Sequence, residues 1–508
     1  IIIKYFQLKS KSNLQSFSRL FYGGENLKKI IYISLISLLL ILTLALAGCG
    51  KKSSDSEIPL NEKIASKAFA YRTDLLDSAE TLTDNNKIQE YLLNWAKSKN
   101  LKYEKDNQGN IIMSMAASEA YIDAAPVTVV CSYDADSFAD SMDAIASALY
   151  IIKNNENTGE LNVIFSPISN GDYSSLDKLS KKYFKDNTKV ISLSGGHKAL
   201  WSVNSGGYSN YLFSGKLATE APTLTTAYKI SISGLTGGTP DGRISSYPNP
   251  VKMFGDLLAS FKTNSLIFEL SSISGGNSSS SYPKNAEMVI VVSEDDVEKF
   301  TAKLDKAIEK FDKKYKEDYP KASYKYEPIT LPGTVYTKES QNTLISSLYT
   351  LADGVFYRNT DDEIVTISNI GTIATNGEVF TISAQGYSLD KTNQTELDNQ
   401  YATTCSLAGI TYNRLSRVQP LSKEFDEGNI TRFQREIIEA YKEYDRSGLE
   451  FKNCVQTTPA VFIAQKNPKL KLVNVVVNKD KLEVYTGSII TFLKNQKHKE
   501  IKEETEDN

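Results

Sequence analysis

The chain has 508 residues, with 58 Lys and Arg against 61 Asp and Glu, and a formal net charge of −3 at pH 7. It is too long for one hydrophobic core, so we expect at least two domains. The slight acidic excess argues against nucleic acid as a partner, because binding phosphates requires a basic surface.

The first residues of the chain do not resemble a folded domain. The chain does not begin with methionine, residues 1–26 carry no signal pattern, and Gly23-Gly24-Glu25 can be encoded by a purine-rich stretch of the ribosome-binding type. We expect translation to begin at Leu27, which would leave residues 1–26 untranslated.

Residues 27–48 have the organisation of an export signal. Lys28 and Lys29 precede an apolar run over residues 30–47, and the small residues Ala47 and Gly48 come directly before Cys49. A cysteine after Leu-Ala-Gly is typical of bacterial lipoproteins, in which the thiol is acylated before cleavage. The pattern predicts a lipid anchor at Cys49 on the outer face of the bacterial cell membrane, since acyl chains hold a protein there. The alternative is an uncleaved transmembrane helix, because the run approaches the roughly 20 residues that a bilayer requires.

Alternating helices and strands follow a polar tether over residues 49–62. Apolar periodicity predicts helices, and continuous apolar runs predict buried strands. The expected helices cover residues 60–80, 87–98 and 139–152, and the expected strands cover 111–115, 126–132, 161–165 and 190–194. This alternation favours an α/β sandwich with a largely parallel sheet.

The arrangement of strands and helices along the chain changes at about Ser205. After this point pairs of strands enclose single helices, whereas before it strands and helices alternate. The strands are expected at 208–217, 228–233, 266–271 and 286–292, and the helices at 248–261, 294–315, 339–352 and 396–408. We interpret residues 206–416 as an α+β lid domain inserted between 63–205 and 417–496, which together form the first domain. A helix at 430–444, a strand at 470–477 and a final apolar segment at 485–493 precede a charged tail over residues 497–508.

Cysteine and histidine limit the available chemistry. Besides Cys49, the cysteines are Cys131, Cys405 and Cys454, and none has a Cys-x-x-Cys spacing, so no zinc ribbon or thioredoxin-type motif is present. A disulfide between Cys405 and Cys454 is one alternative outside the cytoplasm. The two histidines are His197, in a loop pattern, and His498, in the charged tail.

Several segments in order resemble the aminoacyl-histidine dipeptidases, which are dinuclear zinc peptidases. They are residues 88–96, 101–112, 125–130, 161–165, Ser205-Gly206-Gly207, 232–238 and 273–276. The resemblance implies a zinc-exopeptidase-like α/β sandwich with an inserted lid. It also implies two zinc ions held by histidines and carboxylates, with a glutamate as general base.

The ligand positions of that family are mostly altered in this chain. The resemblance places Ser132 where the family has its first histidine, and it leaves Asp134 and Asp140 as the remaining family-like positions. The other altered positions are Ser169 and Asn170 for the paired glutamates, Ser194 for the next aspartate, the region from Asn478 for the last histidine, and Thr239 for the lid histidine. Hydroxyl and amide groups are weak zinc ligands, so we expect no zinc cofactor.

Two other sites remain open from the sequence. Asp134 and Asp140, with Asp136 and Asp143, could form an acidic patch for a hard cation such as calcium. His197 could act as a functional group, although it lies at no ligand position. We therefore expect a lipoprotein on a peptidase scaffold that lacks hydrolytic activity and binds a peptide or another ligand between its domains. The alternatives are an active hydrolase with a non-standard metal site and a purely structural envelope protein.

Overall fold

The computed structural model describes residues 60–154, 158–169, 172–423 and 426–496. The expected signal, Cys49, most of the tether and the charged tail with His498 lie outside the described residues, as does Asn170. Among the helices in the described ranges, none is long and apolar enough to cross a membrane.

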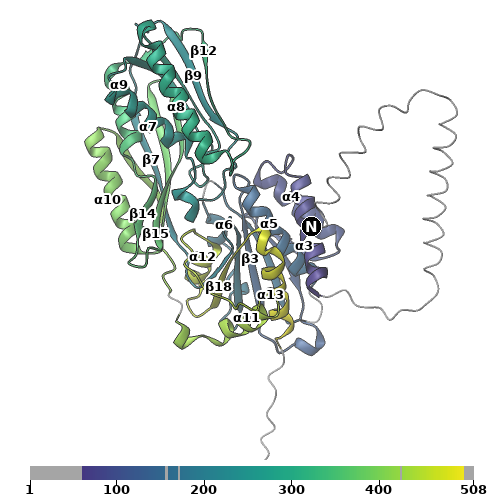
Figure 1. Ribbon diagram of the computed structural model, residues 1–508. Helices are drawn as coiled ribbons and strands as arrows, with labels where there is room; N and C mark the ends of the chain where they lie inside the picture. Colours follow the sequence, from purple (N-terminus) through teal and green to yellow (C-terminus); the bar gives the residue numbers. More distant parts are fainter. Residues whose placement is uncertain (1–59, 155–157, 170–171, 424–425, 497–508) are drawn as a thin grey trace, which may run out of the picture. The chain divides into compact units, whose positions relative to one another are not determined.

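The first sheet has seven strands in the order β1-β2-β4-β3-β5-β18-β6. Two of them, β3 and β18, are labelled in Figure 1. β3, β4, β5 and β18 are parallel to one another, whereas β1, β2 and β6 join antiparallel. The strands are β1 Lys102–Lys105, β2 Ile111–Met115, β3 Val127–Tyr133, β4 Leu161–Pro167, β5 Lys189–Gly195, β6 Leu200–Ser202 and β18 Lys471–Val477. The C-terminal strand β18 therefore lies between two strands that precede it by about 270 residues in the chain.

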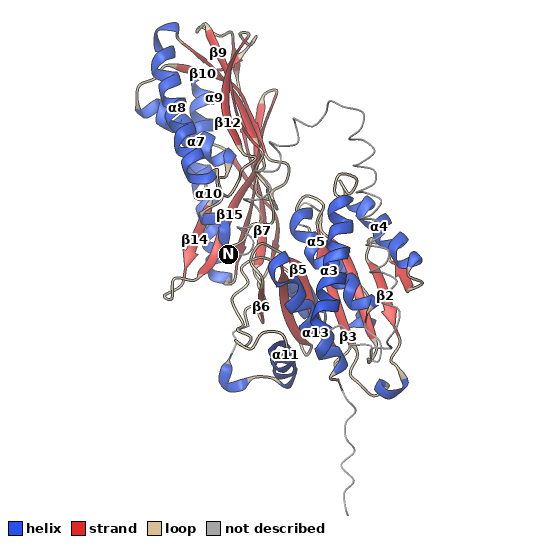
Figure 2. Cartoon of the chain, turned by 45° about the vertical axis from the view of Figure 1, so that its right-hand side comes forward, coloured by secondary structure: helices blue, strands red, loops and turns tan. Residues whose placement is uncertain are grey.

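Helices cover both faces of this sheet, which explains why β3 and β4 are buried along their whole length. Val129 and Val163 belong to one core cluster with α3, α4, α5, α11 and α13, while Val130 and Ile164 belong to another with α6 and α12. Figure 2 shows α3, α5 and α13 together on one side of the sheet. These helices are α3 Leu60–Asp77, α4 Asn85–Ser98, α5 Phe138–Lys153, α6 Ser174–Asp177, α11 Arg432–Lys442, α12 Pro459–Lys466 and α13 Leu482–Lys494.

The second sheet has nine strands, and each of its pairings is antiparallel. Its order is β12-β9-β11-β10-β15-β16-β7-β17, with β14 beside β15. The strands are β7 Gly207–Lys216, β9 Thr226–Ser233, β10 Phe268–Gly275, β11 Ala286–Val292, β12 Ser323–Ile329, β14 Gly354–Arg358, β15 Ile364–Asn376, β16 Val379–Ser388 and β17 Thr411–Val418. A separate pair joins β8 Thr219–Glu220 to β13 Val335–Tyr336.

One face of the nine-stranded sheet carries α7, α8, α9 and α10 (Figure 2). The helices are α7 Pro250–Thr263, α8 Val297–Tyr315, α9 Lys338–Thr350 and α10 Lys391–Ala408. Their ends follow ordinary capping rules: the Asn249 side chain accepts hydrogen bonds from Val251 and Lys252 at the start of α7, and Gly409 closes α10 in a left-handed conformation.

The chain crosses between the two sheets twice, at neighbouring positions. Ser205 and Leu421 exchange backbone hydrogen bonds of 2.9 and 3.2 Å at this crossing. A Cβ on Gly206 would lie 1.8 Å from the carbonyl oxygen of Val455, so only glycine permits this close approach.

The predicted fold class, a mixed α/β chain, is confirmed, and the helices and strands named from the sequence are present with shifts of a few residues at most ends. The domain boundaries remain a prediction. Cys405 and Cys454, considered for a disulfide, are both free and buried, as is Cys131.

Candidate functional site

The parallel strands β3 and β5 end beside a small polar cavity. Its lining residues come from both sheets, from α5 and from the loops around them: Ser132, Tyr133, Asp134, Ser141, Ile168, Tyr173, Ser194, Gly195, Thr239, Ser280, Tyr387, Gln456 and Thr457. It offers about 30 Å³ to a water-sized molecule. Since one water needs roughly 10–15 Å³ by this measure, the cavity holds a water or two and no organic ligand.

Hydroxyl groups surround a buried carboxyl group in this cavity. Ser132 at the end of β3 and Ser194 at the end of β5 are 3.1 Å apart between their hydroxyl oxygens, so they hydrogen-bond to each other. Asp134 is 7% exposed, and its carboxylate accepts a hydrogen bond of 3.0 Å from the backbone N–H of Asp136. Burial raises the pKa of Asp134 to about 7, although the Asp136 N–H and the Ser280 side chain favour its charged form.

The second family-like carboxylate, Asp140, lies in the first turn of α5 and contacts the loop that follows β9. Its Oδ2 atom accepts a hydrogen bond of 2.9 Å from the backbone N–H of Thr239, and the Arg243 guanidinium lies 3.8 Å away. Burial raises the pKa of Asp140 to about 6, and the nearby charge of Arg243 opposes this shift. Both bonding partners belong to a segment about 100 residues distant in the sequence.

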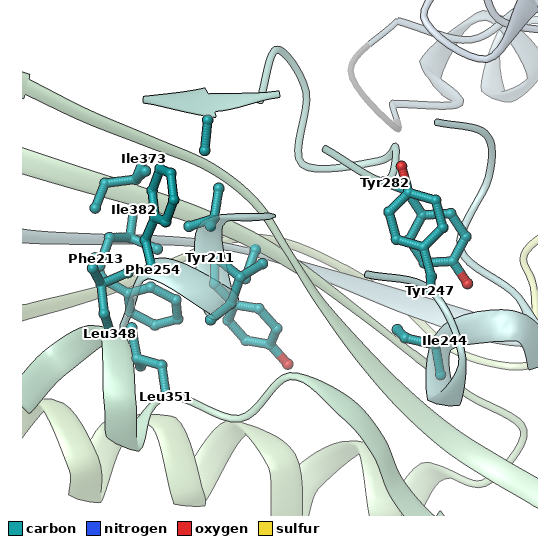
Figure 3. Packing of buried hydrophobic residues seen from close by; sticks show 14 of the residues in the cluster. Tyr211, Phe213, Ile244, Tyr247, Phe254, Tyr282, Leu348, Leu351, Ile373 and Ile382 are labelled. Atoms are coloured by element: carbon teal, nitrogen blue, oxygen red, sulfur yellow. The ribbon is translucent and has the colours of Figure 1, made fainter. Parts of the chain in front are cut away.

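The loop over residues 236–243 is held in place by two stacked tyrosines, Tyr247 and Tyr282, shown in Figure 3. Their ring centroids are 4.2 Å apart and the planes differ by 15°. The Tyr247 hydroxyl accepts a hydrogen bond from the backbone N–H of Gly237, and the Tyr282 hydroxyl accepts one from that of Asp241. The loop therefore presents the Thr239 N–H to Asp140 from a rigid support.

The remaining positions of the predicted set lie elsewhere. Ser169 is exposed and pairs with Asp172 rather than lining the cavity. Asn478 caps the 3-10 helix η7 (Lys479–Lys481), and its amide donates to the backbone carbonyl of His197 at 2.6 Å. His197 is itself exposed, and partial desolvation together with Arg243 lowers the pKa of its ring.

The considered calcium patch does not form, because its members have separate partners. Asp143 is buried and makes an ion pair of 2.6 Å with Arg72, while Asp140 is engaged by the loop after β9. Within the described ranges, no three His, Cys, Asp or Glu residues come together as a set that could hold a metal ion.

The side chains at this sheet edge do not fit the dinuclear zinc centre that the fold family implies. Such a centre needs imidazole and carboxylate groups that converge with free lone pairs. Ser132 and Ser194 instead supply hydroxyls that satisfy each other, and one Asp140 oxygen already accepts the Thr239 N–H.

A much larger cavity, of about 1230 Å³, lies between elements of the two sheets. It is lined mainly by the β5–β6 connection and β6, the turn between β14 and β15, and residues 450–456. Gln456 lines both cavities. Asp241 also lines the larger cavity and belongs to the loop that contacts Asp140, so the larger cavity lies next to that loop. This cavity exceeds the usual volume range of small-molecule pockets, which is roughly 300–1,000 Å³.

The fold of this chain is that of solved peptidase structures. The structure is similar to that of aminoacylhistidine dipeptidase from Vibrio alginolyticus, with a TM-score of 0.54, 14% identity, and coverage of 85% of this chain and 97% of that one. For human carnosine dipeptidase 1 the TM-score is 0.45 and the identity 8%, with coverage of 86% of this chain and 99% of that one. For a tripeptidase from Staphylococcus aureus the TM-score is 0.41 and the identity 11%, with coverage of 85% of this chain and 98% of that one. The sequence matches no family model and no curated protein. The predicted resemblance to aminoacyl-histidine dipeptidases is thus confirmed for the fold.

Among the residues of this site that could not be identified from the sequence are Arg243, Tyr387 and Gln456. Arg243 follows a glycine-rich segment, and a single arginine there is a weak signal for an ion pair. Tyr387 lies in strand β16 and Gln456 in the loop before α12, and neither belongs to a sequence motif that indicates a site.

Proposed function

We propose that this protein is a lipid-anchored, extracytoplasmic binding protein that uses the larger cavity for a peptide or another ligand and has lost the hydrolytic activity of its fold family. The main support is the hydrogen bond that the Asp140 carboxylate accepts from the backbone. The resemblance to the dipeptidases places their metal-bridging aspartate near Asp140, but here the Asp140 carboxylate accepts a backbone hydrogen bond of 2.9 Å from Thr239, in the loop held by Tyr247 and Tyr282.

The chemistry of the small cavity supports the same conclusion. Hydrolysis by this class needs a metal that lowers the pKa of a bound water to about 7, and a base beside it. Apart from Asp134, the cavity is lined by hydroxyl, amide and apolar side chains, among them Ser132, Ser194 and Ser280, and none of them supplies a second carboxylate that could act as the base. The volume of about 30 Å³ also leaves no room for a substrate next to Asp134.

Metal analysis and peptide hydrolysis test the loss of activity. We expect the purified protein to contain zinc well below one ion per chain, and to release no histidine from Xaa-His dipeptides with zinc, cobalt or manganese added. A Ser132→His variant should remain inactive, because the groups of a metal centre act as a unit. Two zinc ions per chain, or metal-dependent turnover that disappears in Asp134→Ala, would contradict the proposal and favour the active hydrolase.

A further inference from the structure

The charged groups that line the larger cavity are not all neutralised by one another. Arg358 and Asp362 form an ion pair of 3.7 Å, and Lys452 and Glu450 one of 2.9 Å. Two other carboxylates have structural partners: Asp241 pairs with Arg243 at 3.0 Å, and Asp390 caps α10.

Two carboxylates and two ammonium groups remain. Asp361 and Glu363 on the β14–β15 turn, and Lys198 and Lys423 on other elements, form no ion pair with any described residue. The lining therefore offers two negative and two positive side chains to a ligand. A balanced set of this kind matches a ligand that carries one charge of each sign.

Glu363 is the best positioned of these groups. Its Oε2 atom accepts hydrogen bonds of 3.0 Å from the Asn359 amide and 2.7 Å from the Asn453 amide. Both donors are neutral, so they hold the carboxylate in one place without cancelling its charge. A fixed carboxylate without a cationic partner suits an ammonium group.

The cavity volume indicates the size of ligand that could fit. If a volume of 1230 Å³ were spherical, it would measure about 13 Å across, which equals the span of about four extended residues at roughly 3.3–3.6 Å each. A dipeptide reaches only about 7 Å and would leave most of this space to solvent.

We propose that the larger cavity binds a zwitterionic chain of about four residues, with its ammonium group at Glu363 and its carboxylate at Lys198 and Lys423. This assignment rests on the proposed binding function and specifies its ligand. The proposed ligand is longer than the dipeptide in the name of the Vibrio alginolyticus structure.

Calorimetric titration with alanine peptides tests the assignment. We expect tetraalanine with free ends to bind, and both dialanine and doubly capped tetraalanine to bind about tenfold more weakly, because each loses end-group contacts. Glu363→Gln should weaken tetraalanine several-fold but leave N-acetyl-tetraalanine unchanged. The double variant Lys198→Gln, Lys423→Gln should weaken tetraalanine but leave tetraalanine amide unchanged.

Glu309→Gln and Lys310→Gln, on the exposed face of α8, are the matched controls and should bind as the unaltered protein does. Equal affinity for dialanine, or binding that ignores the capped ends and these variants, would overturn the assignment while peptide binding itself stands. Binding of none of the peptides would overturn both proposals. Cleavage of tetraalanine, seen as new amino groups, would overturn the loss of activity alone.

Discussion

The carboxyl group of Asp134 is buried, and its neighbours stabilise its negative charge only weakly. Burial raises the pKa of this carboxyl to about 7, against about 4 in an unfolded chain. Between these values the unfolded chain releases the proton while the folded chain retains it. The carboxyl therefore favours the folded state least above pH 7, and its contribution to stability is lost as the pH rises from about 4 to about 7.

We expect Asp134→Asn to remove this pH dependence. Asparagine cannot ionise, so the stability of the variant relative to the unaltered protein should increase from pH 4 to pH 8, by up to about 2–4 kcal/mol. Urea unfolding at both pH values measures the difference. Asp312→Asn on α8, where the side chain is exposed, serves as the control. The same stability difference at pH 4 and pH 8 would show that Asp134 ionises normally in the folded protein.

Backbone contacts around Asp140 explain why sequence reasoning found part of the site and missed the rest. The positions of Asp134 and Asp140 follow from the apolar strand that precedes them, so their presence at the sheet edge was predictable. The partner of Asp140 was not, because a backbone N–H donor such as that of Thr239 leaves no mark on residue identity, and 99 residues separate the two. Ser132 and Ser194 meet only because β3 and β5 are neighbours in the sheet.

At the scale of elements, the end of β5 packs directly on the start of α5. A Cβ added to Gly195 would lie 1.8 Å from the carbonyl oxygen of Asp140, so one of the two backbones would have to move. We expect Gly195→Ala to lower the free energy of unfolding by about 1–3 kcal/mol, as overpacking does.

Gly333→Ala is the matched control for this prediction. Nothing lies within 4 Å of a Cβ at Gly333, so that variant should change stability by about 0.5 kcal/mol or less. Urea unfolding of both variants measures the contrast. Equal stabilities for Gly195→Ala and Gly333→Ala would mean that β5 and α5 are not in close contact at this point.

The same elements show what limits prediction from sequence. β3, β4 and β5 were predictable because each is a continuous apolar run buried on both faces. β6 was not, since it has three residues and only tertiary pairing to β18 makes it a strand. α12 was also missed, although Pro459 in its first turn is a helix-start signal.

At the scale of the whole molecule, the anchor at Cys49 is the prediction with the clearest cellular result. Acyl chains on this thiol should place the protein in the membrane fraction, because each buried methylene contributes roughly 0.8 kcal/mol. We expect Cys49→Ala to abolish lipidation, measured by labelled fatty acid, and to release the protein from membranes. A variant that is unlabelled but still wholly in the membrane fraction would favour a spanning helix over residues 30–47.

The place of β18 between β5 and β6 also determines the order in which the molecule can assemble. A ribosome completes β7 to β17 before it reaches residue 471, so the nine-stranded sheet can form from a contiguous stretch of nascent chain. β5 must meanwhile keep an unpaired edge, and β6 has no strand partner at all until β18 has been made. A chain truncated before residue 471 should therefore expose an aggregation-prone sheet edge, however well its middle part has folded.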